Sequence, residues 1–427
     1  MLRKAILWTG ISQTGQYGIQ FISTIILARL LTAEDFGIVG MVTIFITFSQ
    51  VVVDSEMGGA LLRKKIVFDI DFSTLFVYNL IISIILYLIL YFSAPILASF
   101  YEKPILVPVI RILSISVLLH SFRIVQRIKL LRQLNFKVLA LISVISGLIS
   151  LLIAIWMGVE GYGFWALIIQ QLVSISISVL IMCFYNKYWP SFSFSFSSFK
   201  EQFLFGIGLL GADTLKTIAN NINANVIAKV MPLNQTGYFV QSTKLTNFSV
   251  NIVSAVMDQT LFPIMSKIDD NVELYDLYSK FYRLTTAVLT YITMWIILLS
   301  SSLIVTLLGE HWVDASWMLS ALSLTILPCS IQTLCRNILK SRAETRKVFL
   351  IETVKSVLMI LALLITSIWG IYAIIVGTIV VQLLVAVWMM YIISFEINYS
   401  LFDQIKNIIP SILICIGVFY CISWLQS

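Results

Sequence analysis

Residues 206–237 read GIGLLGADTLKTIANNINANVIAKVMPLNQTG, an apolar helix of membrane-spanning length that carries four regularly spaced polar side chains. Asp213, Lys216, Asn220 and Asn223 recur at intervals of three and four residues, which places them on one face of an α-helix. A charge near the centre of a bilayer costs about 2.5–3.5 kcal/mol, so this face must meet a polar cavity or a partner. The stripe therefore predicts a substrate cavity. The alternative is that Asp213 and Lys216 only neutralise each other inside a helix bundle.

The same stretch repeats an earlier part of the chain. ARLLTAEDFG at 28–37 aligns without a gap with AKVMPLNQTG at 228–237, so that Gly37 matches Gly237, and we expect both glycines to permit a tight turn between helices. The alignment continues towards the N-terminus through three polar pairs: Gln13 with Asp213, Gln16 with Lys216, and Gln20 with Asn220. Transporters are commonly built from such repeats, with the substrate site between them.

Composition restricts the class of protein. The chain is 59% hydrophobic and 11% charged, with a mean hydropathy of +0.97, whereas about a quarter of the residues in a soluble domain are charged. The first apolar segment is longer than the apolar region of a signal peptide and lacks a cleavage site, so we expect it to span the membrane itself. The composition predicts an integral membrane protein.

Apolar windows of about 19 residues predict the spans. They lie near 5–28, 38–60, 73–98, 105–125, 138–158 and 163–184, and again near 201–227, 237–260, 282–307, 315–336, 348–369 and 371–394. The run 408–425 is long enough to cross once more. We therefore predict an all-α membrane protein with twelve or thirteen transmembrane helices. Residues 1–185 and 201–394 form two six-helix bundles, 186–200 a cytoplasmic connecting loop at headgroup level, and 395–427 an additional transmembrane helix.

Charge in the connections predicts the orientation. Basic clusters lie at 3–4, 63–65, 127–137, 187–200, 267–283 and 340–347, all on one side of the predicted topology. The opposite connections hold Glu34, Asp35, Glu102, Glu160, Glu310 and Asp314. Positively charged loops face the cytoplasm, so the N-terminus is predicted to be cytoplasmic. The net charge of +7 expresses this asymmetry and attraction to anionic membrane lipids, and it requires no nucleic acid partner.

No catalytic or metal-binding motif is found. His120 and His311 lie far apart in the sequence, and HExxH, GxSxG and phosphate-binding-loop patterns are absent, so no catalytic residue, metal or cofactor is predicted. Coupling to a proton or sodium gradient stays open, with Asp213 as the candidate. Asp54, and Glu352 with Lys355, are interpreted as interfacial charges or interhelical partners rather than as an ion site.

Two stretches carry a family resemblance. GQYGIQFISTIILARLLTAEDFGIVGMVTIFITF at 15–48, followed by ALLRKK at 60–65, resembles the Wzx-type polysaccharide and O-antigen flippases of the multidrug/oligosaccharidyl-lipid/polysaccharide superfamily. GYFVQSTKLTN at 237–247 resembles the start of their second half. The resemblance implies a MATE-like fold in the bacterial cytoplasmic membrane. It also implies movement, by alternating access, of an undecaprenyl-pyrophosphate-linked oligosaccharide for O-antigen, capsule or exopolysaccharide. Longer members of the group continue with further C-terminal helices.

The implied substrate is anionic and needs a hydrated, partly cationic cavity to cross the bilayer. Lys216, Lys244 and Arg111 are the candidate cations, although Lys244 is also placed to reach headgroups. The remaining candidates offer hydrogen bonds or coupling: Asp213, Asn220, Asn223, Asn247, Gln13, Gln16 and Gln20. The implied partners are the lipid-linked oligosaccharide, membrane lipids, a polysaccharide polymerase and a chain-length regulator. A multidrug or cation antiporter and a lipid II flippase are the alternatives.

Overall fold

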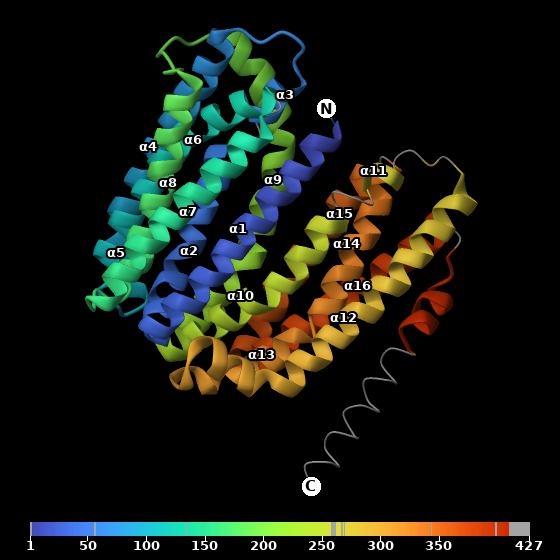
Figure 1. Ribbon diagram of the computed structural model, residues 1–427. Coiled ribbons are helices and arrows are strands. Elements are labelled where there is room, and N and C mark those ends of the chain that lie inside the picture. The colour runs from blue at the N-terminus through green and yellow to red at the C-terminus, as the bar shows by residue number, and fades with distance from the viewer. Residues whose placement is uncertain are drawn as a thin grey trace. The chain divides into compact units, whose positions relative to one another are not determined.

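The computed structural model describes residues 2–54, 57–133, 135–257, 262–265, 268, 270–342, 344–397 and 399–409. Helices make up nearly all of this part of the chain, and no strand occurs in it (Figure 1). Contacts divide the chain into two compact units, Met1–Gly237 (unit 1) and Tyr238–Ser427 (unit 2). The prediction of an all-α protein is confirmed.

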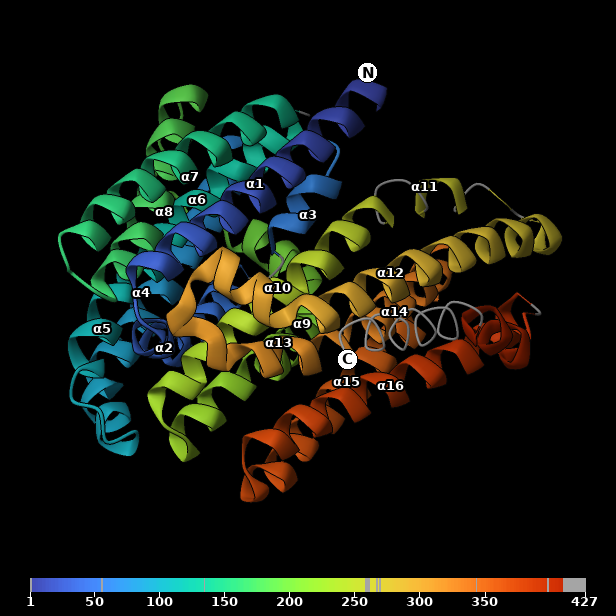
Figure 2. The same ribbon diagram turned by 60° about the horizontal axis from the view of Figure 1, so that its bottom comes forward.

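Unit 1 contains the first nine helices and the beginning of the tenth. They are α1 (Leu2–Leu30), α2 (Ala33–Asp54), α3 (Met57–Arg63), α4 (Asp69–Phe100), α5 (Leu106–Leu113), α6 (Ile115–Arg132), α7 (Phe136–Val159), α8 (Trp165–Asn186), α9 (Phe196–Val230) and α10 (Leu233–Val256). Helix α1 lies along α7, and α7 along α8 (Figure 2). Helix α2 packs against α9, α6 and α4.

Unit 2 contains the rest of α10 and the helices that follow it. They are α11 (Phe262–Met265), α12 (Asn271–Leu308), the 3-10 helix η2 (Glu310–Ala315), α13 (Ser316–Ser323), α14 (Ile326–Ser341), α15 (Thr345–Thr366), the 3-10 helix η3 (Ser367–Trp369) and α16 (Ile371–Glu396). Helix α16 packs against both α14 and α15, and α12 contacts α13 and α14.

The twelve predicted spans each correspond to one helix or to consecutive helices. In the described part of the chain, nine helical segments are long and apolar enough to cross a membrane. The predicted thirteenth span, 408–425, lies outside the described residues from residue 410 onward, and helix covers 401–409. The predicted bundle boundaries remain a prediction, because the division of contacts after Gly237 concerns compactness and not the repeat.

The fourth and tenth predicted spans are each broken at the same place of the repeat. Between α5 and α6 the hydroxyl of Ser114 donates to the carbonyl of Arg111 at 2.9 Å, and between α13 and α14 Thr325 donates to Leu322 at 2.7 Å. The repeat is therefore visible in the backbone as well as in the sequence.

The connection between α8 and α9 is shorter than predicted. Helix α9 begins at Phe196, because the hydroxyl of Ser195 accepts the N–H of Ser198 and caps the first turn. Residues 187–195 are irregular and form no strand. Trp189 and Phe192 are exposed there, as an interfacial segment requires.

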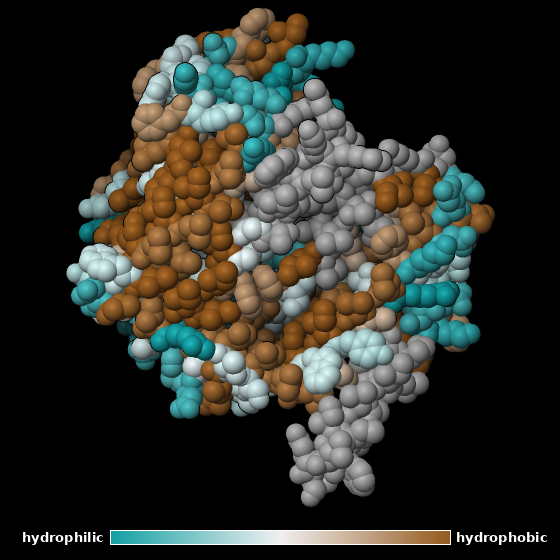
Figure 3. Space-filling view, in the orientation of Figure 1, coloured by the Kyte–Doolittle hydropathy of each residue, from teal (hydrophilic) through white to brown (hydrophobic). Residues whose placement is uncertain are grey.

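Large apolar side chains cover the outer faces of the helices. Phe92 and Ile96 of α4, Leu152 of α7 and Val376 of α16 are more than half exposed. On the face of unit 1 seen in Figure 3, a broad apolar band separates hydrophilic groups at its two ends. A surface of this kind is stable in lipid and not in water.

Candidate functional site

The two copies of the repeat meet at their first turns, within unit 1. A Cβ atom on Gly37 would lie 2.5 Å from the carbonyl oxygen of Leu233, and one on Gly237 would lie 1.8 Å from that of Ala33. Residues 33 and 37 align with 233 and 237, so the contact of Gly37 with Leu233 and the contact of Gly237 with Ala33 are equivalent in the two copies. Both glycines lie inside helices and neither has a positive φ. The expected role in a tight turn is therefore wrong: the glycines permit close approach of two backbones.

Asp35 organises the turn of the first copy. Its Oδ2 accepts the backbone N–H of Thr32 at 2.9 Å and the Thr32 hydroxyl at 2.8 Å, while the N–H of Asp35 donates back to that hydroxyl. A Cβ on Gly163, which has φ +56°, would lie 3.0 Å from the Asp35 carboxylate. Asp35, the acidic residue of the ARLLTAEDFG stretch that matches the first copy of the repeat, thus caps a helix.

Helix α9 is attached to α4 at the same end of unit 1. Lys229 Nζ donates to the carbonyl of Phe100 at 2.6 Å and to Glu102 at 3.2 Å. The hydroxyl of buried Tyr101 donates to Asn225 Oδ1 at 3.0 Å. We call this end, which also holds Asp35, the acidic end.

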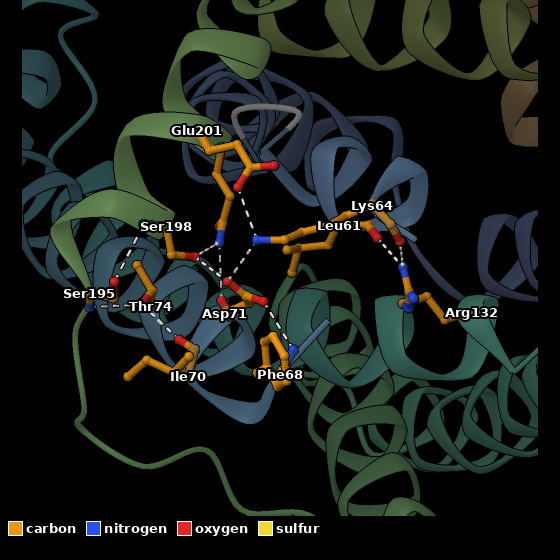
Figure 4. A network of polar contacts seen from close by, with 11 residues as sticks. Leu61, Lys64, Phe68, Ile70, Asp71, Thr74, Arg132, Ser195, Ser198 and Glu201 are labelled. Atoms are coloured by element: carbon orange, nitrogen blue, oxygen red, sulfur yellow. Dashed lines mark hydrogen bonds and ion pairs between the residues drawn. The ribbon is translucent and has the colours of Figure 1, made fainter. Parts of the chain in front are cut away.

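A polar network closes the opposite end of unit 1, which we call the basic end. Asp71, only 3% exposed, accepts hydrogen bonds from Lys64 Nζ at 3.2 Å, from the Ser198 hydroxyl at 2.6 Å and from the N–H of Phe68 at 3.0 Å (Figure 4). Lys64 also donates to Glu201 at 2.9 Å, and this hydrogen bond raises the pKa of Lys64 above its usual range. The network therefore joins the residues after α3 to the first turns of α4 and α9.

The connecting segment is attached to the same end. Gln126 of α6 donates to the carbonyl of Tyr188 at 2.8 Å and accepts from Asn186 at 2.7 Å. Lys129 Nζ lies 3.7 Å from the centre of the Tyr188 ring, a cation–π contact. Arg132 donates to the carbonyl oxygens of Leu61 and Lys64 (Figure 4). The beginning of α9 is thus held by α3, α4 and α6 together.

The predicted cavity residues have different outcomes. The side chains of Gln13, Gln16, Asp213, Lys216 and Asn220 lie outside the described residues. Asn223 is buried in unit 1, whereas Gln20, Lys244 and Asn247 are exposed. Arg111 donates from Nε to the carbonyl of Tyr91 at 3.4 Å and stacks on the Tyr91 ring at 4.3 Å. It is therefore engaged with α4, and the predicted site as a whole remains a prediction.

A charged group that sequence reasoning only partly found lies inside unit 2. Arg336 of α14 donates to Glu352 of α15 at 2.9 Å, and both side chains are about one fifth exposed. Lys355 donates to Gln332 at 2.7 Å, and Gln332 donates in turn to Gln382 of α16. Glu352 is confirmed as an interhelical partner. Arg336 was missed as a membrane residue because the predicted span ended at 336, whereas α14 continues to Ser341.

Unit 1 has a charged group between α2 and α6. Asp54, at the end of α2, approaches His120 of α6 at 4.0 Å. Arg123 and Arg127 lie one and two turns further along α6, within electrostatic range of His120. In unit 2 the aligned residue Ser254 of α10 lies 3.3 Å from Thr333 of α14. The two units therefore repeat a polar contact between these helices and place cations beside it.

The comparisons with known proteins decide the family. The sequence profile of the polysaccharide biosynthesis protein family matches residues 26–317. The chain belongs to this family. This chain is 26% identical to the teichuronic acid biosynthesis protein TuaB of Bacillus subtilis over 74% of its length. It is 25% identical to the succinoglycan biosynthesis transport protein ExoT of Rhizobium meliloti over 76% of its length. It spans 66% of the length of each of these relatives. The lipopolysaccharide biosynthesis protein WzxC of Escherichia coli is 20% identical over 84% of this chain and 73% of its own length.

Solved structures identify the fold. The lipid II flippase MurJ, in an inward closed conformation, matches with a TM-score of 0.81 and 14% identity, covering 97% of this chain and 93% of that chain. An inward-facing MATE family transporter of the MOP superfamily matches with a TM-score of 0.69 and 14% identity, covering 93% of this chain and 99% of that chain. The family member thus has the fold of MOP transporters.

Proposed function

We propose that this polysaccharide biosynthesis family member is a flippase that moves undecaprenyl-pyrophosphate-linked oligosaccharide units across the bacterial cytoplasmic membrane. The main observation in support of this proposal is that a MOP transporter fold extends over nearly the whole chain while the sequence belongs to a polysaccharide biosynthesis family. The names of TuaB, ExoT and WzxC all concern surface or exported polysaccharides. A pyrophosphate-linked glycan cannot cross about 30 Å of hydrocarbon unaided.

Alternating access is the proposed transport cycle. The close backbone contacts of Gly37 and Gly237 at the acidic end support this cycle. They hold the two copies of the repeat together there, so the side-chain rearrangements of alternating access fall on other parts of the helices. The basic end is proposed to face the cytoplasm, since its loops carry the lysine and arginine clusters. Reporter fusions after Lys65 and after Lys200 are expected to report cytoplasm, and a periplasmic signal from either fusion would contradict this orientation.

A cellular assay tests the substrate. Deleting the gene in its own host is expected to abolish export of one surface polysaccharide and to accumulate its lipid-linked repeat unit on the cytoplasmic leaflet. Normal export after deletion would refute the proposal. The MurJ-like fold makes a lipid II flippase the second candidate, and it is tested in the same way. Rescue of a strain depleted of its lipid II flippase, with polysaccharide export unaffected by deletion, would favour that candidate.

We propose Lys216 as the phosphate contact within the cavity, with Asp213 as its neighbour and the site of any proton or sodium coupling. Lys216→Ala is expected to preserve abundance and abolish export, whereas Lys216→Arg retains part of it because the charge survives. If Lys216 only neutralises Asp213, its loss strands a buried carboxylate and lowers abundance. The double variant Asp213→Asn with Lys216→Ala then restores export, and that result would refute the phosphate contact.

A further inference from the structure

Unit 2 holds more positive than negative charge in the group formed by Arg336, Glu352 and Lys355. At 1.5 Å per residue, Arg336 lies about 8 Å inside the end of α14, and Lys355 about 15 Å inside the start of α15. Both residues lie within helical segments that are long and apolar enough to cross a membrane, and an uncompensated charge inside such a span is expensive. One carboxylate for two cations leaves a positive excess that an anion would neutralise.

The hydrogen-bonding capacity of these cations is not used up. The guanidinium of Arg336 donates to Glu352 and to Thr333 at 3.2 Å, yet its Nε is buried and has no partner among the described residues. An ammonium carries three N–H donors, and the hydrogen bond described for Lys355 goes to the Gln332 amide oxygen, a neutral acceptor. Buried donors without acceptors are costly, so these two side chains are poised to accept a ligand that supplies oxygen atoms.

Unit 1 carries a comparable charged group on a different helix pair, α2 and α6. There Asp54 lies 4.0 Å from His120 of α6, and Arg123 lies within electrostatic range of both. His120 Nδ1 and Arg123 Nε are buried without a hydrogen-bond partner in the described part of the chain. Both copies of the repeat thus carry buried cation donors that no described residue satisfies, on α6 in unit 1 and on α14, the second half of the corresponding span, in unit 2.

We propose that Arg336 and Lys355 form an anion subsite in unit 2 that takes a phosphate-bearing group, and that Glu352 is the counter-ion of Arg336 until the anion arrives. The planar fork of Arg336 matches two phosphate oxygens, and Lys355 adds a point charge. Gln332 and Thr333 hold the two cations in place. This inference rests on the proposed function for its ligand, the pyrophosphate of the lipid carrier.

An anion subsite and a purely structural ion pair predict opposite effects of Glu352→Gln on anion binding. If Glu352 competes with the ligand for Arg336, then removing its charge by Glu352→Gln must tighten anion binding. If the pair only holds α14 to α15, the same variant loosens the bundle and weakens binding of every ligand, because Arg336 is left without its partner. Lys347 of α15, which pairs with Glu396, is a cation on the same helix outside the group and serves as the matched control.

The test uses the full chain in nanodiscs of zwitterionic lipid, with binding measured for undecaprenyl pyrophosphate, undecaprenol, phosphatidylglycerol and inorganic pyrophosphate. Arg336→Gln and Lys355→Gln are each expected to weaken binding of undecaprenyl pyrophosphate about tenfold, and Glu352→Gln to tighten it several-fold. Binding of undecaprenol is expected to stay unchanged in all of them, which also shows that each variant is folded. Lys347→Gln is expected to bind all four probes as the parent protein does.

Three results separate the outcomes. Parent-like binding of undecaprenyl pyrophosphate by Arg336→Gln and Lys355→Gln, or weaker binding by Glu352→Gln, would overturn the subsite. Phosphatidylglycerol binding with the same dependence on Arg336 would overturn its assignment to the lipid carrier and identify a lipid headgroup instead. Inorganic pyrophosphate that competes and shows this dependence would support recognition of the phosphates.

Normal polysaccharide export after gene deletion would refute the proposed function and leave these binding results unaffected.

Discussion

Replacing Gly237 by alanine tests the contact between the two copies of the repeat. The new Cβ would lie 1.8 Å from the carbonyl oxygen of Ala33. Carbon and oxygen atoms meet at about 3.3–3.6 Å, so the two backbones must separate by roughly 1.5 Å. For Gly37→Ala the distance to Leu233 is 2.5 Å, and the required separation is roughly 1 Å. Neither neighbour is a flexible side chain that could turn away.

The expected magnitudes follow from two opposing effects. Alanine is favoured over glycine inside a helix by about 1 kcal/mol, whereas overpacking a tight contact costs typically about 1–3 kcal/mol and occasionally more. Gly18 of α1 is the matched control, because a Cβ there meets nothing within 4 Å. We expect Gly18→Ala to be slightly more stable than the parent protein, Gly37→Ala less stable, and Gly237→Ala the least stable.

Thermal unfolding of the purified full chain in detergent, followed by size-exclusion chromatography, measures this order. The double variant adds a sharper test. One separation of the two helices accommodates both new methyl groups, so Gly37→Ala combined with Gly237→Ala should be about as unstable as Gly237→Ala alone. Additive losses, or a Gly237→Ala protein as stable as Gly18→Ala, would refute the reciprocal contact.

Three further predictions concern the two ends of unit 1. Asp71→Asn removes the carboxylate that Lys64 and Ser198 share, and it should lower stability by about 2 kcal/mol, more than Glu201→Gln does, as thermal unfolding of both variants will show. The raised pKa of Lys64 means that its contribution is complete below the usual lysine pKa and is lost as pH rises through the folded-state value. The melting temperature should therefore fall less steeply with rising alkaline pH for Lys64→Met than for the parent protein. Parallel curves of melting temperature against pH would contradict the assignment. Tyr101→Phe removes the hydrogen bond to Asn225 and should cost about 1 kcal/mol, and an unchanged melting temperature would show that this bond does not hold α9.

The fold class followed from the sequence because it depends on local properties. Runs of apolar residues long enough to cross a bilayer, together with lysines and arginines in alternate connections, define spans without any knowledge of tertiary contacts. The repeat was also readable, since Gly37 and Gly237 recur in aligned motifs. The helices found at each of the first twelve predicted spans, and the MOP transporter fold, confirm both the class and the family resemblance.

Which atoms meet was decided only by the tertiary structure. The sequence showed that Gly37 and Gly237 match, yet their packing on Leu233 and Ala33 depends on how two helices cross. The predicted span ended at Arg336, whereas α14 continues to Ser341, and the pairing of Arg336 with Glu352 joins side chains from separate helices. Periodicity records which face of a helix is polar, but the neighbour of that face is set by packing between helices distant in sequence.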